Sequence, residues 1–178
     1  MSSQWLSVKL KYLYFSFVAV LFLVSNPVLA DSKEVALKAA LIYKMGQYVT
    51  WTNPPKILNY CFVGETSKTV GKVLEDRLSK LQGGNSQIVY RSKIDDIERY
   101  ECQVIYMTNA KSKHKEKVDD LSKFSLTIGE NTSALSHGFI TVLEIKSRKP
   151  QLYASRGNLK QAKFKVSSRL LKSSKLVD

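Results

Sequence analysis

The chain has 178 residues, of which 24% are charged, and a formal net charge of +13 at pH 7. This length suits a single domain with a substantial buried core. A strongly basic cytoplasmic protein would be a candidate for nucleic-acid binding. The start of the chain indicates export, which makes that interpretation poor and favours anionic surfaces or an acidic protein partner. The simpler alternative is that the charges only keep a small protein soluble.

The first thirty residues have the three zones of a secretory signal peptide. Lys9 and Lys11 provide a positive beginning, and an apolar run of 13 residues, 12–24, follows them. Small residues before the cleavage point predict processing after Ala30. The alternative is a retained membrane anchor, but the run is short for a hydrocarbon core about 30 Å thick. In both cases the rest of the chain lies outside the cytoplasm.

Cleavage would leave residues 31–178 as one domain. This mature chain has 148 residues, and the loss of two lysines lowers its net charge from +13 to +11. Its only cysteines are Cys61 and Cys102. An oxidising compartment favours their pairing, and a bridge closing a loop of 42 residues would stabilise the fold by about 4 kcal/mol. Two free buried thiols remain the alternative.

The pattern of apolar residues predicts alternating helices and strands. A first helix is expected over Ser32–Trp51, with Ser32 as its N-cap and a buried stripe at three- and four-residue steps. A second helix is expected after a turn at Gly64–Ser67, with Val70, Leu74, Leu78 and Leu81 on its buried face. Strands are expected at Ile57–Val63, Gln87–Arg91, Gln103–Met107 and Phe124–Ile128, with a hairpin formed by Phe139–Ile145 and Gln151–Ala154. Further helices or helical turns are expected at 92–99, 111–121, 131–136 and, closing the chain, 158–176.

This alternation predicts an α/β layered sandwich with a mostly parallel central sheet, an antiparallel C-terminal hairpin and a closing helix. A disulfide requires Cα atoms within about 7 Å. The strands that carry Cys61 and Cys102, which are the first and third strands, must therefore be neighbours. The second strand then flanks the first on its other side, in the order 2-1-3 of a doubly wound sheet. The hairpin is expected to extend one edge in antiparallel fashion.

The sequence contains no clear catalytic or metal-binding constellation. The segment Gly64–Thr69 resembles a phosphate-binding loop only faintly, since it lacks the second glycine and the spacing of that motif. Capping of the following helix by Thr66 or Ser67 is the expected role. The two histidines, His114 and His137, have no partners at the spacing of a zinc site. We therefore expect no catalytic residue, no metal and no cofactor.

Three aromatic residues, Tyr43, Tyr48 and Trp51, gather at the end of the first predicted helix. Packing against the sheet is the expected role for all three. A small pocket or a partner surface is the competing interpretation. Together with the Gly64 loop, this cluster is where a small ligand or an anion could bind.

Five segments, in order along the mature chain, resemble the YfiR family, also called YfiR/HmsC-like or DUF4154. The segments are Lys38–Lys44 with Val49–Trp51, Tyr60–Gly64, Cys102–Tyr106, Leu126–Glu130 and Val166–Leu171. The chain departs from the family pattern at several points. Trp51-Thr52 stands where Trp-Pro is common, His137-Gly138 stands where a glycine pair is usual, and a glycine often found near Lys163 is missing. The best-known member also has a second disulfide, for which this chain has no cysteines.

The resemblance implies a periplasmic regulatory protein, not an enzyme, that is often dimeric. Its partner would be the periplasmic domain of a membrane-bound diguanylate cyclase, which it would repress, thereby modulating cyclic-di-GMP signalling and biofilm formation. It also implies that the Cys61–Cys102 bridge contributes to stability and redox sensitivity. Contact with the membrane is expected only through the partner, and no contact with nucleic acid is expected.

The contact surface is expected in the C-terminal hairpin and helix, where apolar and basic residues alternate. The residues proposed for it are Phe139, Leu152, Phe164 and Leu171. An acidic partner would find complementary charge there. The alternative function is a periplasmic module that binds a small ligand or an anion without catalytic activity.

Overall fold

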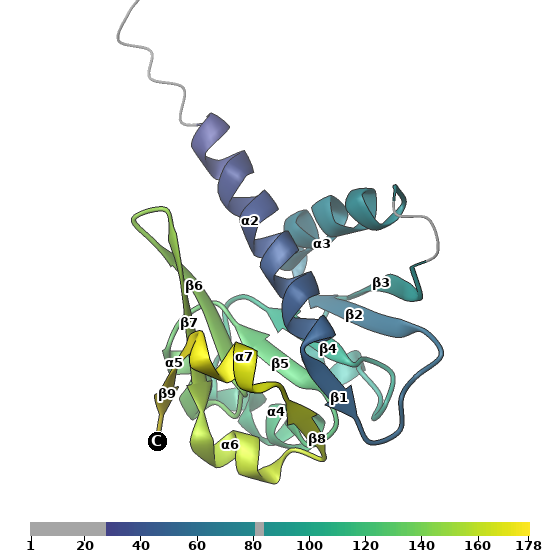
Figure 1. Ribbon diagram of the computed structural model, residues 1–178, viewed down its shortest axis with the longest axis vertical. Helices are drawn as coiled ribbons and strands as arrows, with labels where there is room; N and C mark the ends of the chain where they lie inside the picture. The colour runs from purple at the N-terminus through teal and green to yellow at the C-terminus, as the bar shows by residue number, and fades with distance from the viewer. Residues whose placement is uncertain (1–27, 81–83) are drawn as a thin grey trace, which may run out of the picture. The chain divides into compact units, whose positions relative to one another are not determined.

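The structure is a computed structural model that describes residues 28–80 and 84–178 (Figure 1). The chain divides into two units, residues 1–33 and Glu34–Asp178. The fold described below is that of Glu34–Asp178. Most of the predicted signal peptide, residues 1–30, lies outside the described residues, as does Leu81 of the second predicted helix.

A seven-stranded sheet with the order β3-β2-β4-β5-β6-β7-β9 forms the centre of this unit. Every neighbouring pair from β3 to β6 is parallel. The predicted layered α/β fold with a mostly parallel sheet is therefore confirmed, and so is the predicted order of the first three strands, because β2 lies between β3 and β4. The strands are β2 (Leu58–Val63), β3 (Ser86–Arg91), β4 (Val104–Met107), β5 (Leu126–Gly129), β6 (Thr141–Lys146), β7 (Lys149–Ser155) and β9 (Ser174–Val177).

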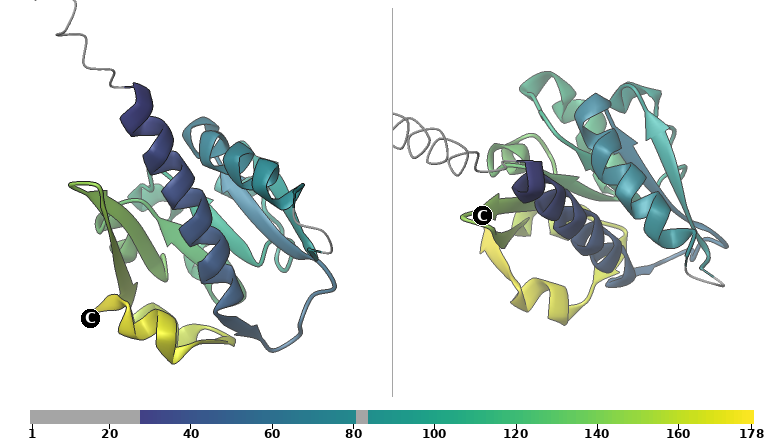
Figure 2. Two further views of the ribbon diagram at one scale, coloured as in Figure 1. Left: turned by 45° about the horizontal axis from the view of Figure 1, so that its top comes forward. Right: turned by 90° about the horizontal axis from the view of Figure 1, so that it is seen from above.

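Both faces of the sheet are covered. Successive residues of a strand point to opposite faces, so one strand contributes side chains to two cores. Tyr60 and Phe62 of β2 pack into one core with helices α2 (Val28–Gln47) and α3 (Glu65–Leu78). Cys61 and Val63 pack into a second core on the other face. Figure 1 and Figure 2 show α2, from Glu34 onward, and α3 on the same face. The second face is covered by η1 (Ile94–Asp96), α4 (Lys115–Ser122) and α5 (Ser133–Ser136), and η2 (Ser112–His114) leads into α4.

The first helix is shorter at its C-terminal end than predicted. It ends at Gln47, and Val49–Trp51 form strand β1, which pairs with β8 (Phe164–Val166) in a separate two-stranded antiparallel sheet. A β-branched residue pair followed by an aromatic residue favours a strand. The prediction placed Val49 in the helix because it falls on the helical period of the buried residues, but it belongs to β1. Ser32 lies inside the helix and does not cap it.

The predicted closing helix is wrong. Residues 158–176 instead contribute to α6 (Arg156–Gln161), β8, α7 (Ser168–Lys172) and β9. Two serines mark the breaks, because the Ser155 hydroxyl accepts a hydrogen bond from the Asn158 amide and the Ser167 hydroxyl accepts one from the Leu170 amide. Such serine caps begin new helices. Although the chain has no glycine near Lys163, this segment is not one continuous helix, because β8 separates α6 from α7.

The hairpin forms, but its place in the sheet differs from the prediction. Its first strand, β6, joins β5 in parallel, and only the pairing of β6 with β7 is antiparallel. The outer edge of the sheet is β9, which pairs with β7 in parallel. The last segment of the chain, and not the hairpin, thus forms this edge of the sheet.

Candidate functional site

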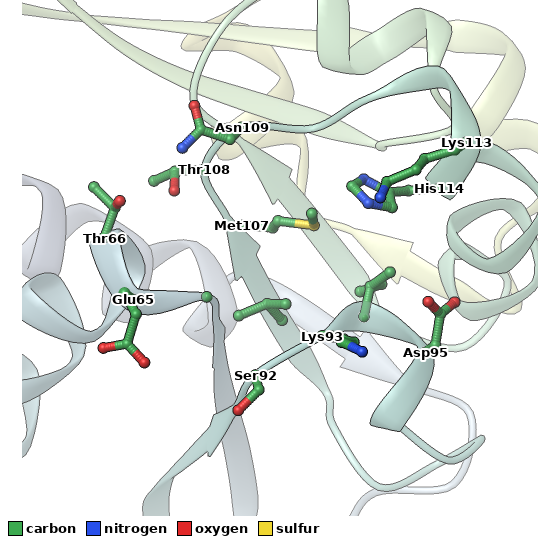
Figure 3. A pocket seen from close by; sticks show the side chains of 13 residues that line it. Glu65, Thr66, Ser92, Lys93, Asp95, Met107, Thr108, Asn109, Lys113 and His114 are labelled. Atoms are coloured by element: carbon green, nitrogen blue, oxygen red, sulfur yellow. The ribbon is translucent and has the colours of Figure 1, made fainter.

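A cavity of about 240 Å³ opens at the carboxyl ends of the parallel strands β2, β3 and β4. The chain leaves β2 through α3 on one face of the sheet, whereas it leaves β4 through α4 on the other face. Adjacent strands whose connections diverge in this way create a crevice, and ligands of open α/β sheets bind in such crevices. Figure 3 shows Met107 from the end of β4 at the centre of this cavity.

One wall of the cavity is the start of α3. Gly64 has a φ of +83°, a conformation that residues with a Cβ rarely adopt. Thr66 and Ser67 do not cap the helix as predicted, since no side chain caps it. Ser67 is buried instead, and its hydroxyl accepts a hydrogen bond of 3.2 Å from the amide of Thr108. This bond ties the start of α3 to the end of β4.

The opposite wall carries basic side chains from two short helical turns. Lys93 lies beside η1, and Lys113 and His114 belong to η2 (Figure 3). The Nδ1 atom of His114 accepts a hydrogen bond of 3.2 Å from the Lys111 amide. Partial burial, followed by the neighbouring charge of Lys113, lowers the pKa of His114. His114 is half-buried and lines this cavity.

A second, larger cavity of about 430 Å³ lies near the end of β1. Trp51, Tyr100, Phe124 and Lys163 are among the residues that line it. The Tyr100 and Phe124 rings are 4.6 Å apart, and the Lys163 ammonium lies 4.9 Å from the Phe124 ring centre. Tyr100 is 62% exposed. The cavity thus combines open aromatic surface with a positive charge.

The predicted aromatic cluster is divided between different contacts. Tyr43 packs against Tyr60, Trp51 packs against Phe164, and Tyr48 lies under the guanidinium of Arg169. All three cluster residues are partly buried against the first core. Trp51 also lines the larger cavity.

The two cysteines form a disulfide with a Cα–Cα distance of 5.8 Å. Cys61 lies in β2, Cys102 lies just before β4, and both side chains are almost fully buried. The bridge therefore joins two adjacent strands from within the second core.

No group of three or more histidine, cysteine, aspartate or glutamate side chains that could hold a metal occurs within residues 28–80 and 84–178. In the same described part, none of the helices combines the length and apolar character needed to cross a membrane. His114 lines the cavity at the ends of the parallel strands, and His137 follows the last residue of α5.

A family model described as YfiR/HmsC-like matches residues 35–175, which is most of the chain and almost all of the unit described above. The chain belongs to the YfiR/HmsC-like family. Membership in this family supports a periplasmic regulatory role connected with diguanylate cyclases in general. Membership confirms the resemblance on which the functional expectations rest.

Among solved structures, the chain resembles a crystal structure of a conserved domain protein from Vibrio cholerae O1 biovar El Tor str. N16961. The TM-score is 0.52, the sequence identity is 12%, and the match covers 81% of this chain and 60% of that chain. At this identity the likeness concerns the fold alone, and the chain spans less than two thirds of the other protein. No curated protein matches.

The four residues predicted to contact a YfiR-type partner are not on one surface. Phe139 is fully buried in the second core, whereas Phe164 is buried in the first. Leu152 and Leu171 are half-buried near the outer edge of the sheet. The exposed apolar side chains of this region, Leu176 and Val177 on β9, were missed because the segment had been predicted as a helix.

Proposed function

We propose that this protein binds the periplasmic domain of a membrane-bound diguanylate cyclase and represses it, thereby lowering cyclic-di-GMP and restraining biofilm formation. The family match over residues 35–175 carries the proposal. Repression by binding requires the protein to prefer the inactive conformation of the cyclase, because only a difference in affinity shifts a conformational equilibrium.

The surface proposed for this contact is the C-terminal edge, defined as strand β9 with Leu152 and Leu171 beside it. β9 pairs with β7 on one side and is the last strand of the sheet, so its other side presents unpaired backbone groups. Leu176 and Val177 are 41% and 39% exposed there. An exposed edge with apolar side chains suits the addition of a partner strand.

The charge near this edge favours an acidic partner. Lys172 and Lys175 are exposed on α7 and β9. The turn of the β6–β7 hairpin adds a further basic segment, residues 146–149, whose side chains are exposed. Opposite charges would speed association and orient the two proteins, and this effect weakens with added salt.

The test is co-expression with the candidate cyclase in the parent cell and measurement of cyclic-di-GMP. The wild-type protein should lower the cyclic-di-GMP level, and Leu176→Asp should relieve that repression. Ile57→Asp is the matched control, because Ile57 is an apolar residue of similar exposure, 49% against 41% for Leu176, that lies outside the proposed surface. Equal repression by both variants would exclude the C-terminal edge, and a wild-type protein without effect would refute the function itself.

A second copy of the chain is the competing occupant of this edge. Sedimentation analysis of the wild-type protein and of Leu176→Asp separates the two cases. If the substitution converts a dimer into a monomer that still represses the cyclase, the edge is a contact between copies of this chain, and the cyclase binds elsewhere.

The second candidate function is a module that binds an aromatic ligand carrying an acidic group. The observation that favours it is the larger cavity, which is lined by Trp51, Tyr100 and Phe124 and by the positive charge of Lys163. A thermal-shift screen with aromatic amino acids tests it, with Tyr100→Ala as the site variant. Stabilisation of the wild-type protein but not of the variant would support this function, and no stabilisation of either would remove it.

A further inference from the structure

The cavity at the carboxyl ends of β2, β3 and β4 is separate from both surfaces considered above. In the sheet order, β3, β2 and β4 occupy one end and β9 occupies the other. The residues that line this cavity differ from those of the aromatic cavity. Its role is therefore independent of the proposed contact with a cyclase.

The balance of charge in this cavity favours an anion. Among the described residues, neither Lys93 nor Lys113 forms an ion pair, although both line the cavity. Two carboxylates, those of Glu65 and Asp95, also line it. The Glu65 carboxylate is paired with Lys68 at 2.5 Å, so Asp95 is the one carboxylate of the lining without such a partner in the described chain.

His114 adds a hydrogen-bond donor even when it is neutral. Its Nδ1 accepts a hydrogen bond from the Lys111 amide, and a neutral imidazole carries its proton on the other nitrogen. The Nε2–H group is therefore the free donor of this ring. Figure 3 shows the ring beside the Lys113 side chain at the edge of the cavity.

The wall facing these side chains contributes backbone donors. Glu65 and Thr66 occupy the first turn of α3, where amide groups have no partner inside the helix. The Ser67 hydroxyl is committed to Thr108 and does not cap this turn. The position where a Cβ of Gly64 would lie has no neighbouring atom within 4 Å, so a ligand can approach the backbone there.

We propose that this cavity binds a compact phosphate-bearing anion. Lys93 and Lys113 supply the charge, the His114 Nε2–H donates from the same wall, and the first turn of α3 donates from the opposite wall. A tetrahedral oxyanion has enough acceptor oxygens to meet donors on both walls. The volume of about 240 Å³ is below the roughly 300–1,000 Å³ of pockets for drug-sized ligands, which favours inorganic phosphate or a small phosphomonoester over a dinucleotide.

The test is calorimetric titration of the exported protein with inorganic phosphate at constant ionic strength. The site variant is Lys93→Gln/Lys113→Gln. The control variant is Lys72→Gln/Lys80→Gln, which removes the same charge from exposed positions on or next to α3 that do not line the cavity. Loss of two charge-assisted hydrogen bonds should weaken phosphate binding in the site variant by at least about tenfold, whereas the control should bind like the wild-type protein.

Three outcomes would overturn the proposal. The first is the absence of saturable phosphate binding to the wild-type protein. The second is an equal loss of affinity in both variants, which would indicate non-specific attraction to a basic surface. The third is tighter binding of succinate than of phosphate, which would replace the phosphate class with a dicarboxylate. Circular dichroism spectra of both variants would show whether each retains the fold.

Discussion

At the scale of single residues, Gly138 meets the strictest steric requirement. Its φ is +91°, and a Cβ built on it would lie 2.2 Å from Oδ1 of Asp119. Its carbonyl also accepts a hydrogen bond of 2.8 Å from the buried hydroxyl of Ser122. A side chain at this position would therefore disturb the contact between α4 and the start of β6.

We expect Gly138→Ala to lower the free energy of unfolding by about 1–3 kcal/mol, because it combines backbone strain with a steric clash. Gly157→Ala is the matched control, since Gly157 lies in helix α6 and a Cβ there would meet only the Ser155 hydroxyl at 3.8 Å. Alanine favours a helix over glycine by up to about 1 kcal/mol. Urea denaturation of both variants checks this, and equal stabilities would contradict it.

The same scale includes tyrosines whose hydroxyl groups lie in the core. The Tyr60 hydroxyl donates to the carbonyl of Tyr43 and accepts a hydrogen bond from Gln47. Burial raises the pKa of Tyr60 well above its usual value, and the hydrogen bond from Gln47 opposes this effect only in part. Burial, together with the charge of Glu130, raises the pKa of Tyr106 in the same direction.

When the pKa of a tyrosine is higher in the folded than in the unfolded chain, its contribution to stability is complete at pH values below the unfolded pKa of about 10. That stability is lost as the pH rises above about 10, because the unfolded chain releases the proton first. We expect thermal stability to fall over this range, and Tyr60→Phe to flatten the fall while costing about 1 kcal/mol at neutral pH. Melting curves at neutral and alkaline pH check this, and an unchanged slope in the variant would contradict it.

At the scale of elements, the disulfide holds β2 against β4. The bridge spans 41 positions in sequence and is almost fully buried. It also lies in the strand pair next to the cavity proposed to bind an anion, because Val63 and Met107 are the last residues of those strands. Loosening this pair should therefore affect both stability and the shape of the cavity.

We expect the double variant Cys61→Ser/Cys102→Ser to lose about 4 kcal/mol of unfolding free energy, since the bridge closes a long loop in the unfolded chain. Reductant should lower the melting temperature of the wild-type protein and leave that of the variant unchanged. Differential scanning fluorimetry with and without reductant tests the expectation. A wild-type protein that is insensitive to reductant while containing free thiols would refute it.

At the scale of the whole molecule, the sheet separates three surfaces. The cavity proposed to bind an anion lies at one end of the strand order, and the C-terminal edge lies at the other. The aromatic cavity is formed by residues near β1 and by residues that precede β4 and β5. Independent sites on one regulator would let a ligand and a protein partner act on it separately. Whether they are coupled is measurable as a change in the affinity for one in the presence of the other.

The processed form of the molecule is a further prediction at this scale. We expect the exported protein to begin at Asp31, because small residues precede that position in the pattern of a cleavage site. Intact mass measurement of protein from the periplasmic fraction tests this, and a mass that includes residues 1–30 would indicate a retained anchor.

Much of the fold could be predicted because local sequence patterns and the sheet reinforce each other. Strand β4, and β2 from Tyr60 onward, are apolar on both faces, as is usual in a parallel sheet. One covalent constraint, the Cys61–Cys102 pair, then placed these strands side by side. The C-terminal segment was different, since its apolar residues match a helical period although Phe164–Val166 pair with β1, far away in sequence.

By itself, the sequence determined the family, the alternation of strands and helices, the disulfide pairing and the order of the first three strands, because these depend on local periodicity and one cross-link. Only the tertiary structure decided which side chains share a surface. It buried Phe139, exposed Leu176 at a sheet edge, and gathered Lys93, Lys113 and His114 around the start of α3. Such groupings arise where parallel strands end together. Residues that are distant in sequence meet there, and no local sequence pattern predicts which ones will meet.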